Sequence, residues 1–132
     1  DVFAKLKPSR DAQIQRLKQV LVNLTLRLRS RYALVSLREE QLALVLADAA
    51  GPLRAAAAAL LEMEGQPVTS PKAALATVSR SLGVADEVLA QLSEARETRA
   101  LPAGVAVTTL FGLLDLAEKM RGRVERLGGY AA

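Results

Sequence analysis

Apolar residues between positions 9 and 50 recur with the period of an α-helix. Large aliphatic side chains follow one another at spacings of three, four and seven residues, which places them within about 80° of one another around a helix. These positions are Ile14, Leu17, Leu21, Leu24, Leu28 and Val35. A second apolar stripe, on roughly the opposite face, consists of Val22, Leu26, Ala33 and Leu37. Because one packed layer cannot cover both faces, we expect this helix to lie centrally in a bundle or to contact another chain.

Glycine and proline indicate where this first helical segment ends. Residues 9–50 contain neither, and the serine that begins this range is the expected N-cap. Gly51 and Pro52 are expected to end the segment, since glycine suits the left-handed position after a helix and proline cannot continue one. An unbroken helix over this range would be about 63 Å long. A break near Ser30 or Ser36 is the alternative, and the sequence leaves the choice open.

Further helices are predicted over residues 53–64, 72–82, 85–99 and 102–127. Their borders fall at glycines and prolines, and Ser70 with Pro71 forms an N-cap followed by a first-turn proline. No stretch alternates apolar and polar residues over the length of a strand. The 24 leucines and 24 alanines among 132 residues also favour helices. The prediction is therefore an all-α, single-domain helical bundle of four to six helices over residues 1–132, with a long first helical segment.

The last predicted helix supplies the other half of the expected core. Its apolar face consists of Val107, Leu110, Leu114, Ala117, Met120 and Val124, broadened by Leu113, Leu116 and Leu127. We expect the best-buried positions of the bundle to be Leu17, Leu21, Leu24, Leu110, Leu114 and Val124. Small residues recur every fourth position at Gly104, Thr108 and Gly112, and we expect these to accept a bulky neighbour.

The missing residue types exclude most catalytic and metal chemistry. The chain has no Cys, no His and no Trp. These absences exclude Ser-His-Asp and Cys-His nucleophiles, Cys/His zinc sites and His- or Cys-ligated haem. We therefore expect no cofactor and no enzymatic activity.

The ends and the compartment of the chain are loosely defined by its sequence. The first residue is Asp1 rather than Met, which we take to indicate a fragment of a longer chain. The longest uncharged run, residues 100–114, contains a proline and two glycines, so we expect no transmembrane helix. The absence of cysteine fits the cytoplasm and an oxidising compartment equally. We favour the cytoplasm, with an extracytoplasmic sensor fragment as the alternative.

Charge is distributed unevenly along the chain. Residues 1–38 carry nine basic and two acidic side chains, whereas residues 39–132 carry nine basic and twelve acidic ones. A basic line between the two apolar stripes of the first helix consists of Arg16, Arg27, Arg31 and Arg38. These arginines either cover the edge of the core with their methylene stems or face an electrostatic partner. No aromatic residue interleaves them to stack on nucleic-acid bases.

Apolar residues around Gly83 have the spacing of two short helices joined by a tight turn. The expected buried positions are Val78, Leu82, Val84, Leu89 and Leu92, with the small Ser79 before the turn. This segment resembles the helix-turn-helix unit of bacterial regulators over about twenty residues. The resemblance implies a recognition helix, but that helix would present three acidic side chains and no basic side chain to DNA. The positions that would face DNA are Ala85, Asp86, Glu87, Ala90, Gln91 and Glu94. Phosphate repulsion opposes such binding, so the packing of a helical corner is the competing interpretation.

Paired carboxylates are the remaining catalytic residue type. Glu94 and Glu97, and Asp115 and Glu118, stand three residues apart on two consecutive predicted helices. This arrangement loosely resembles all-helical nucleotide pyrophosphohydrolases, which hold Mg²⁺ through such pairs, although their second pair runs in the opposite order. The first pair points away from the apolar stripe of its helix, and Asp115 precedes Lys119 by four residues as in an ordinary surface ion pair. We therefore expect solvated acids and no metal site.

These observations favour a non-enzymatic helical interaction module, such as a scaffold, an assembly chaperone or a sensor-type bundle. The expected interaction surface consists of Val22, Leu26, Leu37, Arg16, Arg27, Arg31 and Arg38. We expect a protein partner or a second copy, and we favour the homodimer because the short helices barely suffice to surround so long a first helix. The alternative is a nucleic-acid-binding regulator that uses the segment around Gly83 or the basic line. A Mg²⁺-dependent nucleotide pyrophosphohydrolase is a distant third.

Overall fold

The part of the chain that the computed structural model describes, residues 9–35 and 39–127, consists of α-helices and the loops that connect them and contains no strand. It forms five helices, which confirms the prediction of an all-α bundle with four to six helices. The helices are α2 (Arg10–Val35), α3 (Glu39–Met63), α4 (Pro71–Ser81), α5 (Asp86–Thr98) and α6 (Val105–Leu127).

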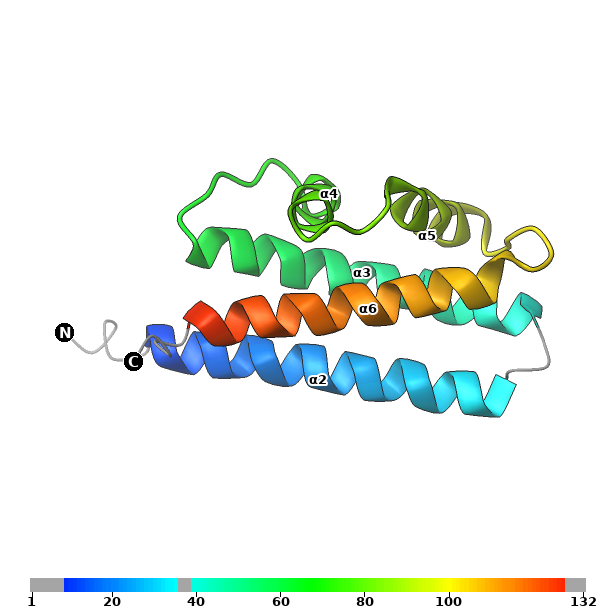
Figure 1. The fold of residues 1–132 in the computed structure, drawn as a ribbon, viewed down its shortest axis with the longest axis horizontal. Coiled ribbons are helices and arrows are strands. Elements are labelled where there is room, and N and C mark those ends of the chain that lie inside the picture. The colour runs from blue at the N-terminus through cyan, green and yellow to red at the C-terminus, as the bar shows by residue number, and fades with distance from the viewer. Residues whose placement is uncertain (1–8, 36–38, 128–132) are drawn as a thin grey trace.

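The three long helices form the body of the bundle. Figure 1 shows α2, α3 and α6 side by side, with the two short helices α4 and α5 covering α3. The helix α3 contacts every other described helix, whereas α2 packs mainly against α3 and α6. The two short helices therefore leave one long side of α2 and the adjoining side of α3 uncovered.

The first helical segment consists of two helices. The helix α2 ends at Val35, α3 begins at Glu39, and the two pack against each other, so a single helix over residues 9–50 is wrong. Of the two break positions considered, Ser30 lies inside α2 and Ser36 lies outside the described residues. The predicted N-cap is confirmed, since the hydroxyl of Ser9 accepts a hydrogen bond of 3.0 Å from the backbone amide of Ala12.

The helix α3 continues through Gly51 and Pro52, so the predicted helix end at these residues is wrong. A proline inside a helix leaves the carbonyl four residues earlier, that of Asp48, without its helical partner, at a cost of about 3 kcal/mol. The guanidinium of Arg96 on α5 lies against Gly51, and its Nη1 donates a hydrogen bond of 3.2 Å to the carbonyl of Ala47. Burial of the flanking apolar residues against the other helices offsets the local cost.

The buried face of α2 agrees with the first predicted stripe. Its five described members are all buried, namely Ile14, Leu17, Leu21, Leu24 and Leu28, and the side chain of Val35 lies outside the described residues. On α6, Leu110 and Val124 are buried as expected, but Leu114 is only half-buried. Met120 is buried as predicted, and Leu113 and Leu116, expected only to broaden the face, are fully buried. Leu114 lies about 100° around the helix from Leu113.

The expectation that the small positions near and in α6 accept a bulky neighbour is confirmed at Gly112 but is wrong at Gly104 and Thr108, which are exposed. A Cβ atom on Gly112 would lie 2.8 Å from Cγ2 of Val88 on α5, so a side chain at this position would displace α5. The helix α6 begins three residues later than predicted, because Gly104 adopts a left-handed φ of +80°.

An ion pair joins the ends of three helices. Nη2 and Nε of Arg123 on α6 donate hydrogen bonds of 2.6 and 2.7 Å to the carboxylate of Glu64, directly after α3. Nη1 of the same guanidinium donates a hydrogen bond of 2.6 Å to the hydroxyl of Ser81, at the end of α4. The hydrogen bonds to Glu64 raise the pKa of Arg123. This pair fixes the end of the bundle at which α3, α4 and α6 meet.

Candidate interaction surface

A long groove follows the seam between α2 and α3. It comprises two depressions of about 520 Å³ and 440 Å³, lined on both sides by residues of these two helices. Successive lining positions recur every three or four residues on each helix, so both depressions open on the same face of the helix pair. On its other flank, α2 contacts α6 through Lys18, whose Nζ lies 3.7 Å from Oε1 of Glu125. The groove therefore lies on the side of α2 that faces away from α6.

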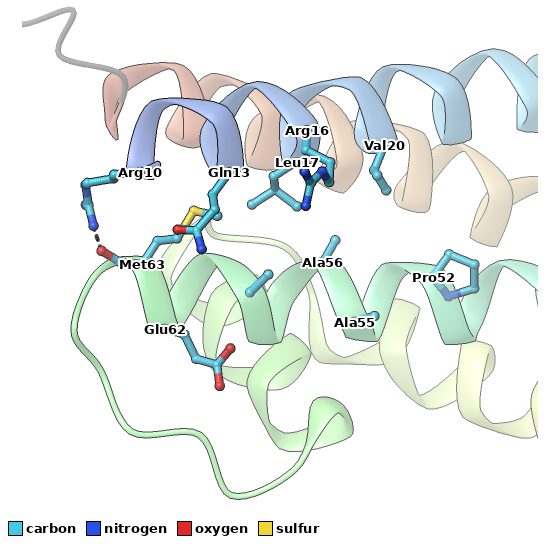
Figure 2. A pocket seen from close by; sticks show the side chains of 11 residues that line it. Arg10, Gln13, Arg16, Leu17, Val20, Pro52, Ala55, Ala56, Glu62 and Met63 are labelled. Atoms are coloured by element: carbon cyan, nitrogen blue, oxygen red, sulfur yellow. Dashed lines mark hydrogen bonds between the residues drawn. The ribbon is translucent and has the colours of Figure 1, made fainter. Parts of the chain in front are cut away.

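The first depression lies between the start of α2 and the end of α3. Figure 2 shows the side chains of both helices that line it: Arg10, Gln13, Arg16, Leu17, Val20, Pro52, Ala55, Ala56, Ala59, Glu62 and Met63. Alanines and Pro52 form most of the α3 wall, so this wall is shallow and apolar. At its end, Nη2 of Arg10 donates a hydrogen bond of 2.8 Å to the carbonyl of Met63 and bridges the two helices.

The second depression continues along the same seam toward the start of α3. Its lining residues are Leu24, Arg27, Leu28, Arg31, Gln41, Leu44, Val45, Asp48, Ala49 and Arg99. Arg99 follows α5 in a left-handed conformation, and its Nη2 lies 3.6 Å from Oδ1 of Asp48. Exposed or half-buried aliphatic side chains, Val20 in the first depression and Leu44 and Val45 in the second, give the groove an apolar component along its length.

The α2 wall of the groove carries positive charge that no described residue neutralises. Within residues 9–35 and 39–127, Arg16, Arg27 and Arg31 make no hydrogen bond and no ion pair. By contrast, the six arginines between positions 54 and 123 each contact a described oxygen atom: Arg54, Arg80, Arg96, Arg99, Arg121 and Arg123. Among the described residues, five arginines and two carboxylates line the groove, so the net charge of this lining is positive.

The structure divides the interaction surface that the sequence predicts. Arg16, Arg27 and Arg31 lie together on the groove, but Val22 is half-buried and Leu26, which is 58% exposed, lies about 100° around the helix from Arg27. Leu37 and Arg38 lie outside the described residues, as does the side chain of Ala33. The basic line and the second apolar stripe therefore belong to different faces.

The sequence did not reveal the α3 half of the groove. Ala55, Ala59 and Glu62 stand at spacings of four and three residues, which indicates one face of a helix. Because Gly51 and Pro52 predict a border between two separate helices, the sequence does not align this face with Leu44 and Asp48. In the structure, the continuous helix α3 places all five residues along one groove wall.

The segment around Gly83 forms the corner between α4 and α5. Val78, Val84 and Leu92 are buried, and Gly83 has the left-handed φ of +77° that the turn requires. Leu82 and Leu89 are half-buried against the same core. The acids of the second helix, Asp86, Glu87 and Glu94, are exposed and give that helix a negatively charged outer surface.

The paired carboxylates lie on the surface. Glu94 and Glu97 are exposed on α5. Asp115 forms an ion pair of 3.0 Å with Lys119, and Glu118 accepts hydrogen bonds from Arg121. Among the described residues, no three acidic side chains are grouped closely enough to hold a metal ion.

The helix α3 is long and apolar enough to cross a membrane, by length and composition alone. Half of its most apolar stretch is buried inside the bundle. This property is common to the central helices of bundles, so the expectation of no transmembrane helix stays a prediction.

Comparisons with known protein families, with curated proteins and with solved structures find no match to this chain.

Proposed function

We propose that this chain is a non-enzymatic helical interaction module that binds a protein partner through the face formed by α2 and α3. One observation carries this proposal: an open, partly apolar groove runs along the seam of the two helices and presents three arginines without a described partner. Unneutralised charge beside exposed aliphatic groups is typical of surfaces that a second molecule covers.

Site-specific photo-crosslinking tests this proposal in the organism that encodes the chain. A photoreactive phenylalanine replaces Ala55 in the groove, Leu26 on the outer face of α2, or Thr77 on α4, all three of which are exposed. We expect a discrete protein adduct from position 55 that is absent from position 77. Identical adducts from all three positions, or none from any position, would contradict the proposal.

A second copy of the chain is the other candidate partner, and the exposure of Leu26 favours it. At 58%, Leu26 is the most exposed of the large apolar side chains described. If this face forms a homodimer, sedimentation velocity will give twice the monomer mass, and Leu26→Glu will restore the monomer while leaving the helical content unchanged. An adduct between two copies at position 26 distinguishes this arrangement from binding in the groove.

The competing enzymatic function is tested by the double variant Glu94→Gln with Glu118→Gln. Because both carboxylates lie at the surface, we expect the free energy of unfolding to change by less than about 1 kcal/mol. We also expect no Mg²⁺-dependent nucleotide hydrolysis by the parent chain. Hydrolysis by the parent that the double variant loses would overturn the assignment as a non-enzymatic module.

A further inference from the structure

We infer that the occupant of the α2–α3 groove is an amphipathic helix of a partner protein, with acidic residues along the edge that faces α2. This inference rests on the proposed function and specifies the partner. It follows from the shape of the groove, from the positions of its arginines and from the excess of arginines over carboxylates.

The shape of the groove suits a helix. The two depressions follow the seam from Arg10 to Arg31, a distance of about 32 Å along α2, which a helix of about 21 residues would span. The small side chains of Ala55 and Ala59 on the α3 wall permit close approach of another backbone. Aliphatic groups at Val20 and Leu44 offer contacts to the apolar stripe of such a helix.

The arginines of the groove define where acidic residues of the occupant would lie. Arg27 follows Arg16 by eleven residues and Arg31 follows Arg27 by four, which correspond to about 16 Å and 6 Å along the axis of α2. A helix lying beside α2 has the same rise per residue. Its carboxylates would therefore be spaced four and about eleven residues apart, in an order set by the direction of the helix. Arginine favours such carboxylates because its planar guanidinium binds them through two parallel hydrogen bonds.

The charge balance disfavours a dimer in which the grooves of two copies face each other. The described lining of each groove has five arginines against two carboxylates, and one of those carboxylates, Asp48, is already paired with Arg99. Two grooves facing each other would bring together two positive surfaces. Nucleic acid also fits the arginines poorly, because Asp48 and Glu62 occupy the α3 wall and no described aromatic side chain lines either depression.

A charge-reversal selection tests the inference. A displayed library of helical peptides of about 20 residues, randomised on one face, is selected against the intact chain. A second selection uses the variant Arg16→Glu with Arg27→Glu, and a matched control uses Arg29→Glu with Lys72→Glu, two exposed basic residues outside the groove. An unrelated helical bundle serves as the background target.

We expect the parent chain and the matched control to enrich peptides with acidic residues spaced by four and about eleven. The groove variant should bind these peptides at least about 10-fold more weakly and instead enrich peptides with lysine or arginine at the same positions. Helical peptides that bind the parent and the groove variant equally would overturn the acidic-helix inference but leave the interaction module intact. No enrichment above the background target would instead overturn the proposed function.

Two further results would assign the groove to a different occupant and thus overturn the inference. One is a dimer in sedimentation velocity that Arg16→Glu with Arg27→Glu dissociates, which would place a second copy there. The other is competition between the enriched peptides and a generic DNA duplex, with an affinity that falls as salt rises, which would assign the arginines to phosphates.

Discussion

Leu21→Ala is expected to lower the free energy of unfolding by about 2–5 kcal/mol. Leu21 is fully buried on the core face of α2, where this helix packs against α3 and α6. Removal of its isobutyl group loses the transfer free energy of the buried atoms and leaves a cavity that the rigid neighbouring helices fill only partly. Urea unfolding followed by circular dichroism at 222 nm measures the loss.

Leu114→Ala is the matched comparison for this variant. Leu114 belongs to the apolar pattern of α6 but is only half-buried, so its truncation removes less buried area and should cost clearly less than truncation of Leu21. Equal losses in the two variants would mean that the core face of α6 is assigned incorrectly.

Arg123→Gln is expected to lower the free energy of unfolding by about 2 kcal/mol, because it leaves the carboxylate of Glu64 with too few donors. The side chains of this pair are only 17% and 15% exposed, so water replaces the lost hydrogen bonds incompletely. Adding Glu64→Gln should recover part of the loss, since the second change removes the uncompensated charge.

Arg121→Gln provides the control for the ion pair. Arg121 lies two residues away on the same helix and contacts Glu118 and Glu125, but these groups are far more exposed, so we expect a change within about 1 kcal/mol. Chemical denaturation of the parent chain, of Arg123→Gln, of Glu64→Gln and of the double variant gives the coupling energy between Arg123 and Glu64. A coupling energy near zero would show that the pair does not hold the ends of α3 and α6 together.

The elements that could be predicted are those whose determinants lie close together in the sequence. The N-caps at Ser9 and Ser70, the apolar stripe of α2 and the turn at Gly83 all follow from residues within one or two helical turns. The continuation of α3 through Pro52 could not be predicted in this way, because the guanidinium that contacts this region comes from Arg96 on another helix.

The candidate site shows the same division between local and distant determinants. The sequence identified the basic line of Arg16, Arg27 and Arg31, since their spacing on one helix is readily visible. The sequence also groups them with Val22 and Leu26, which lie on another flank of α2, because helix periodicity alone does not determine which flank of α2 meets α3. The second wall of the groove required the antiparallel packing of α2 and α3, a contact between positions far apart in the chain.

Pro52 has a consequence for the curvature that any occupant of the groove must adopt. It lies where the first depression gives way to the second, and the carbonyl of Asp48 beside it lacks a helical amide partner. A missing backbone hydrogen bond lowers the bending stiffness of a helix at that point. The wall formed by α3 is therefore stiff toward both of its ends and compliant at its middle. A straight helix and a gently bent helix would strain this wall differently. The pyrrolidine ring of Pro52 therefore helps to determine the curvature of the helix that fits the groove.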